Sequence, residues 1–69
     1  MKKVHIVFVM EYEGKYHAIA DAIRSGENLI PFINRYHAIT AHLCETATEA
    51  HQTAEAWNRQ FINNGTSIY

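Results

Sequence analysis

The sequence predicts an α+β fold: a small antiparallel three-stranded sheet with two helices packed on one face, in the order ββαβα. Two observations support this prediction. Residues 4–12 are rich in β-branched and aromatic side chains and end at a Glu-Gly turn. Residues 46–63 begin with a capping box and continue with apolar side chains spaced by three and four. The 69 residues form one predicted domain, 1–69.

The first two strands are expected to form a hairpin. The run VHIVFVMEY (4–12) is followed by Glu13-Gly14, where glycine permits the positive φ of a tight turn. KYHAIADAI (15–23) is then the returning strand. Its alanines also suit a helix, but we favour a strand because the first strand needs a partner and the turn is correctly placed.

A short helix and a third strand follow the loop of residues 24–27. Asn28 is a suitable N-cap for a helix over 29–36, where Pro31 lies in the first turn and its missing N–H costs nothing. Residues 37–44 then alternate as a strand. We expect one set of its side chains to face the core and the last helix: Ile39, Ala41 and Leu43.

The last helix has the clearest local signal. Thr46 and Glu49 form the capping box, in which the Thr46 hydroxyl accepts from the Glu49 N–H and the Glu49 carboxylate reaches back. Gly65, after Asn63 and Asn64, is suited to end the helix. The tail, 66–69, could add a fourth strand. The core-facing stripe is predicted to comprise Ala47, Ala50, Ala54, Trp57 and Phe61.

Composition narrows the classes of function. The formal net charge is −1 and no basic run is present, so a strong electrostatic grip on nucleic acid is not expected. A single cysteine forbids an internal disulfide and fits a reducing compartment, so we expect the cytoplasm. The N-terminal run lacks a signal-peptide cleavage site, and no apolar stretch reaches the roughly 18 residues that span a bilayer.

The segment HLCETATEAH places His42, Cys44 and His51 close together in the sequence. A structural zinc site needs four ligands, usually in paired spacings, which are absent; the best metal variant would use His5, His42 and Cys44. A catalytic thiolate would be disfavoured by the acidic neighbour Glu45. We therefore expect no metal, no cofactor and no enzymatic activity, and interpret the segment as a strand-to-helix joint.

A surplus of apolar surface is the feature most relevant to function. A two-residue turn would pair Phe8 with Ile19, leaving apolar side chains on both faces of the hairpin. With both helices on one face, the other face would be uncovered, and such a face usually marks an interface. We expect a homodimer or docking on a larger protein through these residues: Val4, Ile6, Phe8, Met10, His17, Ile19, His42 and Cys44.

The alternative function is nucleic-acid binding. Small sheets can present aromatic side chains on which bases stack, and Phe8, Tyr12 and Tyr16 are the candidates here. The absence of a basic patch makes this the second choice.

Four segments carry a resemblance to other proteins: EYEGKYHAIADAIRSGENL, HLCE, AEAWN and NGTSIY. Over most of its length the chain resembles small bacterial and phage proteins of unknown function. This resemblance implies no activity and no site residues.

Overall fold

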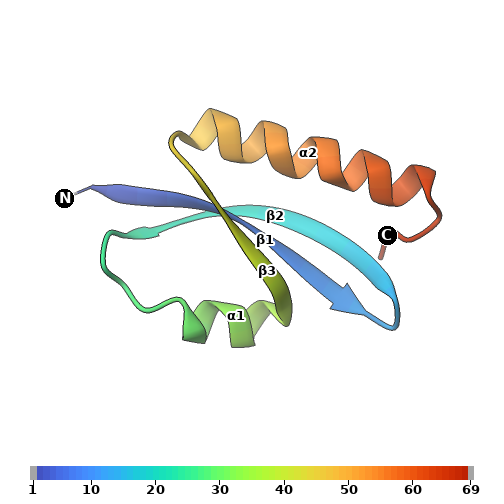
Figure 1. Cartoon of the computed structure of the whole chain (residues 1–69), viewed down its shortest axis with the longest axis horizontal. Coiled ribbons are helices and arrows are strands. Elements are labelled where there is room, and N and C mark those ends of the chain that lie inside the picture. The colour runs from blue at the N-terminus through green and yellow to red at the C-terminus, as the bar shows by residue number, and fades with distance from the viewer. Residues whose placement is uncertain (1, 69) are drawn as a thin grey trace.

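A computed structural model describes residues 2–68 and has an α+β fold in the predicted order ββαβα. Its sheet consists of β1 (Lys3–Tyr12), β2 (Lys15–Arg24) and β3 (Ala38–Cys44). The strand order is β2-β1-β3 and both pairings are antiparallel, so β1 is the central strand (Figure 1). The predicted antiparallel three-stranded sheet is therefore confirmed.

The hairpin has the predicted turn and register. Glu13 and Gly14 both adopt positive φ values, 52° and 79°, as the two-residue turn of a twisted hairpin requires. Phe8 pairs with Ile19 and Val4 pairs with Ile23. The turn thus fixes which side chains of the two strands share a face.

Helix α1 (Ile30–Tyr36) begins one residue later than predicted. The N-cap is Leu29 and not the predicted Asn28, although the Asn28 Oδ1 accepts a hydrogen bond of 3.0 Å from the N–H of Ile30, the first helical residue. At the other end His37 takes a left-handed conformation with φ of 52°. This residue ends the helix and lets the chain turn directly into β3.

Helix α2 (Ala47–Asn63) starts at the predicted capping box. The Thr46 Oγ1 accepts from the Glu49 N–H at 3.1 Å, and the Glu49 Oε2 accepts from the Glu45 N–H at 3.2 Å. The carboxylate therefore reaches one residue beyond the N-cap. After the helix, Gly65 has a φ of 72°, which an L side chain rarely adopts.

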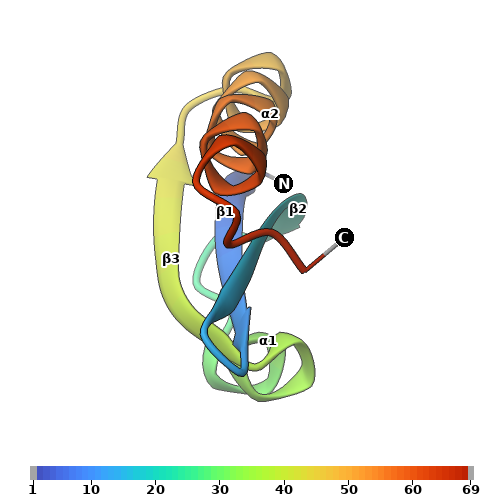
Figure 2. The ribbon, with the colours of Figure 1, turned by 90° about the vertical axis from the view of Figure 1, so that its right-hand side faces the viewer.

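The two helices lie on opposite faces of the sheet, so the prediction that they share one face was wrong (Figures 1 and 2). Helix α2 packs on the face that carries Val7, Val9 and Ala18. Helix α1 packs on the face that carries Ile6 and Phe8. The Phe8 ring lies 5.3 Å from the Tyr36 ring and 6.4 Å from the Phe32 ring, measured between centroids.

The physical reason is that the hairpin is apolar on both faces and each face needs a cover. The α1 segment joins β2 to β3, which lie on opposite sides of β1, so it crosses one face of the sheet. The chain then leaves β3 and returns along the other face as α2 (Figure 1). Alternation predicts which side chains share a face but does not say which helix covers it.

The described part of the C-terminal tail forms an isolated β-bridge and no strand. Ser67 makes a single parallel bridge with Tyr16 of β2. The predicted fourth strand is therefore reduced to one bridge over the described part of the tail, and Tyr69 lies outside the described residues.

Small side chains allow α2 to lie close to the sheet, and this generates a testable prediction. Ala54 is 7% exposed, whereas Ala56 on the same helix is exposed. We expect Ala54→Leu to lower the free energy of unfolding by about 1–3 kcal/mol, because the larger side chain must push the helix from the sheet. Urea unfolding measures this difference. The matched control, Ala56→Leu, should change stability little, and equal losses in both variants would contradict the packing described.

Candidate functional site: the two edges of the sheet

The outer edge of β2 is covered at its first half by groups from the C-terminal part of the chain. The Tyr16 N–H donates to the Thr66 carbonyl at 2.6 Å, and the Tyr16 carbonyl accepts from the Ile68 N–H at 3.0 Å. The next outward residue is Ala18, whose N–H and carbonyl bond to the Asn58 side-chain amide at 2.7 and 2.8 Å. The amide thus takes the place that a neighbouring strand would occupy.

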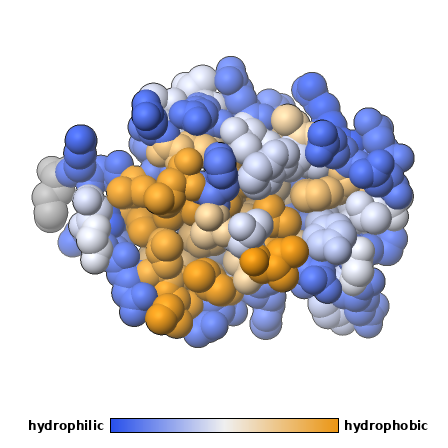
Figure 3. Space-filling view, in the orientation of Figure 1, coloured by the Kyte–Doolittle hydropathy of each residue, from blue (hydrophilic) through white to orange (hydrophobic). Residues whose placement is uncertain are grey.

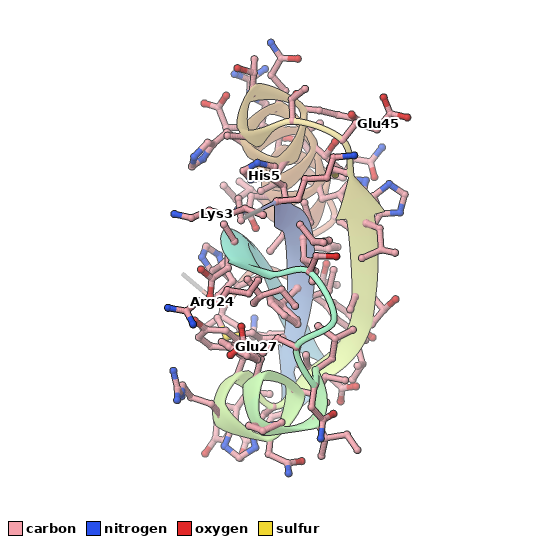
Figure 4. The ribbon with its side chains drawn as sticks, turned by 90° about the vertical axis from the view of Figure 1, so that its left-hand side faces the viewer. Lys3, His5, Arg24, Glu27 and Glu45 are labelled. Atoms are coloured by element: carbon pink, nitrogen blue, oxygen red, sulfur yellow. The ribbon has the colours of Figure 1, made fainter. Side chains whose placement is uncertain are left out.

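Acidic side chains bond to two N–H groups in the second half of the same edge, whereas no hydrogen bond within residues 2–68 reaches the outward groups of Ala20 between them and Ala18. The Ala22 N–H donates to the Asp21 Oδ1 at 2.8 Å, and the Arg24 N–H donates to the Glu27 Oε1 at 3.1 Å. Figure 4 shows Arg24 and Glu27 on the β2 side of the sheet. Asp21 and Glu27 therefore make structural hydrogen bonds that blunt the edge.

The outer edge of β3 has no such cover. Because Ala18 directs its backbone groups outward, its partner Val9 directs its own toward β3, where it pairs with Thr40. By alternation, Ala41 and Leu43 direct their N–H and carbonyl groups away from the sheet. Within the range 2–68, no hydrogen bond from another element reaches these outward groups.

The composition of β3 adds to this exposure. Its sequence, AITAHLC, contains no charged residue and no proline, which are the common means of protecting an edge strand. A register shift lies where Ile39 passes Met10 and Val9, so the regular part of the edge runs over 40–44. The bulge blunts only the start of the strand.

Apolar side chains flank this edge. Figure 3 shows hydrophobic residues gathered over β3 and the start of α1 on the side facing the viewer. We call the following residues the β3 edge patch: Ile30, Ile39 and Leu43, which are 60%, 56% and 62% exposed. Helix α1 has only seven residues and leaves Ile39 and Leu43 largely exposed, and Ile30, its first residue, also lies in solvent.

The predicted interface residues divide between the two faces. One group lies on the α1 face, where Ile6 and Phe8 are fully buried: Val4, Ile6, Phe8, Met10, His17 and Ile19. His42 and Cys44 lie on the α2 face, so their predicted placement beside the first group was wrong. The reason is that the set of β3 containing Ala41 faces α1, not α2.

Cys44 lies in the core beneath α2 and is 7% exposed. Burial raises the pKa of its thiol, and the nearby Glu49 carboxylate raises this pKa further, while a hydrogen bond with Thr53 opposes them. The group is therefore a thiol at neutral pH. Its neighbour His42 packs against Trp57 with ring centroids 5.4 Å apart, in edge-to-face geometry.

A hollow of about 210 Å³ lies between the sheet and the start of α2. His5 and His51 both line it, and Figure 4 shows His5 between the sheet and this helix. The remaining lining comes mainly from alanines, with no buried polar side chain directed into the space. In residues 2–68, no group of three or more His, Cys, Asp or Glu side chains could hold a metal ion.

The aromatic residues considered for base stacking do not form one exposed platform. Phe8 is fully buried beneath α1. Tyr16 packs against Phe61 on the other face, with ring centroids 5.5 Å apart, and Tyr12 is 68% exposed. Stacking by these three residues on one nucleic-acid strand therefore has no geometric support.

Comparison with known proteins finds no matching family model, and neither a curated protein nor a solved structure matches the chain. None of the helices within residues 2–68 has the length and apolar character needed to cross a membrane. Functional conclusions therefore rest on the geometry of the domain itself.

The Asn58 amide provides a test of edge protection. We expect Asn58→Ala to lower the free energy of unfolding by about 1–3 kcal/mol, because it leaves two backbone groups of Ala18 without a partner. Thermal or urea unfolding measures the loss. Gln60→Ala, at an exposed position of the same helix, is the control and should be nearly neutral. A neutral Asn58→Ala variant would show that the amide does not hold this edge.

The burial of Cys44 predicts a specific pH dependence. A pKa raised above its usual 9.0 stabilises the folded state below that pH, and this contribution is lost as the pH rises through the folded-state pKa. We therefore expect the stability of the wild type to fall between neutral pH and about pH 10 more steeply than that of Cys44→Ala. Urea unfolding at both pH values gives the comparison. Parallel losses in the two proteins would contradict thiol burial as the cause.

Proposed function

We propose that this domain is a non-enzymatic interaction module that binds a protein partner through the outer edge of β3. The observation that carries this proposal is the difference between the two edges of one sheet. Hydrogen bonds reach the outward groups of β2 at Tyr16, Ala18, Ala22 and Arg24 and miss only Ala20, whereas nothing in residues 2–68 bonds to the outward groups of β3.

An unprotected edge strand is a template for another strand. A partner segment in extended conformation can donate to and accept from the outward groups of Ala41 and Leu43, which gives affinity through the main chain. Specificity then comes from side chains that contact the β3 edge patch. The binding surface is thus an edge with its apolar border, in place of the uncovered sheet face expected from the sequence.

Two kinds of partner fit this surface: a second copy of the chain and a larger protein with an extended segment. We place the domain in the cytoplasm, because its one cysteine is free and a reducing compartment keeps thiols in that form. The raised pKa of this thiol supports a module without covalent catalysis. Nucleic-acid binding has less support, since Phe8 is buried and no basic run is present.

Leu43 allows a direct test of this function. We expect wild-type protein immobilised on beads to capture specific proteins from a host lysate, and Leu43→Glu to lose at least about nine-tenths of them, because a charge enters an apolar contact. Quantitative mass spectrometry of the eluates, including the chain's own untagged copy, measures capture.

The matched control is Ile62→Glu, because Ile62 is 60% exposed and Leu43 is 62% exposed. Ile62 lies near the end of α2, away from β3, so this variant should retain the wild-type partners. If both variants capture the same proteins as the wild type, including the chain itself, the β3 edge is not the binding surface.

A further inference from the structure

We infer that the partner of the β3 edge is a second copy of this chain, joined by antiparallel pairing of β3 with β3 of the copy. This inference rests on the proposed function of β3 as a binding edge and names its occupant. The result is a continuous six-stranded sheet in which each protomer contributes β2, β1 and β3 in that order from the outside.

The outer edge of β3 is accessible to a second copy of the chain. In Figure 2, β3 is the outermost element on its side of the molecule, and neither helix extends beyond it. Both termini lie on the opposite side. A second copy related by a twofold axis perpendicular to the sheet can therefore approach β3 without meeting a helix or a chain end.

The sequence of β3 is complementary to itself when it runs antiparallel. A twofold axis through Ala41, the middle residue of the strand, places Thr40 opposite His42 of the copy and Ile39 opposite Leu43 of the copy; at Ile39 the bulge interrupts the pairing with β1. The most exposed apolar side chains of the strand thus meet each other, and polar side chains meet polar ones. The outward backbone groups of Ala41 also face those of Ala41 in the copy.

Charge does not oppose this pairing. A charged residue at the twofold axis would meet the same charge in the copy, and like charges on facing strands repel. β3 contains no Lys, Arg, Asp or Glu, and the nearest acidic side chain, Glu45, follows the end of the strand (Figure 4).

The expected dimer is weak. A standard stable interface buries roughly 800 Å² per partner, about a sixth of the 4898 Å² surface of this chain. One strand edge and three apolar side chains supply less than this. We therefore expect a dimer that dissociates on dilution within the micromolar range.

The test uses sedimentation equilibrium of the whole chain from about 1 µM to about 1 mM. The wild type should shift from the 7.9 kDa monomer toward twice that mass. Ile39→Lys and Leu43→Glu should each weaken the dimer by at least about tenfold, because each places a charge against an apolar side chain of the copy.

The double variant Ile39→Lys, Leu43→Glu tests the register. In the proposed dimer, the introduced lysine of one protomer would face the introduced glutamate of the other, and the twofold axis would create this pair twice. Dimerisation should therefore recover by several-fold relative to either single variant. Ile62→Glu is the control and should dimerise as the wild type does. Unfolding midpoints confirm folding; the two substituted side chains are more than half exposed, so large losses are not expected.

Three results would overturn the inference: a wild type that is monomeric throughout, a dimer that both single variants leave intact, or a double variant without recovery. Together with the capture experiment, they distinguish a failure of this inference from a failure of the proposed function. If the wild type is monomeric but captures other proteins in a Leu43-dependent manner, the β3 edge binds a different partner. If neither self-association nor capture depends on Leu43, both conclusions fail.

Discussion

The burial of β1 on both faces is the constraint on which the rest of the domain depends. Ile6, Val7 and Phe8 are consecutive residues of this strand and are all fully buried. Because successive side chains point to opposite faces, three buried neighbours require a cover above and below the sheet. In this domain one helix covers each face.

The two covers are unequal, and the difference determines where apolar surface remains. Helix α2 has 17 residues and approaches the sheet through alanines, with Trp57 and Phe61 filling the wider part of the gap. Helix α1 has seven residues and depends on large side chains, Phe32 and Tyr36, stacked around Phe8. This short helix packs against β3 and β1. Ile39 and Leu43 on β3 and Ile30 on the helix itself stay exposed and form the β3 edge patch.

Local signals in the sequence predicted the elements well, because each depends on neighbours in the chain. The Glu13-Gly14 turn fixed the register of β1 and β2, and Thr46 with Glu49 fixed the start of α2. Which helix covers which face of the sheet depends on contacts between distant segments. The alternation of side chains in β3 does not determine this choice. Either set of its side chains, that of Ala41 or that of His42, could have faced α2. The expectation that the more apolar set does so was wrong, because α1 takes that face.

The hydrogen bonds that cover the β2 edge could not be predicted from the sequence either, for a related physical reason. Asn58 lies 40 residues from Ala18, and its neighbours on α2 mark it only as a polar helix position. Its side-chain amide bonds to Ala18 as a neighbouring strand would, because α2 packs along β2 and brings the amide to the edge of the sheet. The same placement keeps α2 away from the outer side of β3 (Figure 2). A single helix of this length can protect one edge or the other. By closing β2, the fold leaves β3 as the side on which main-chain hydrogen bonds must be completed by another molecule or by water.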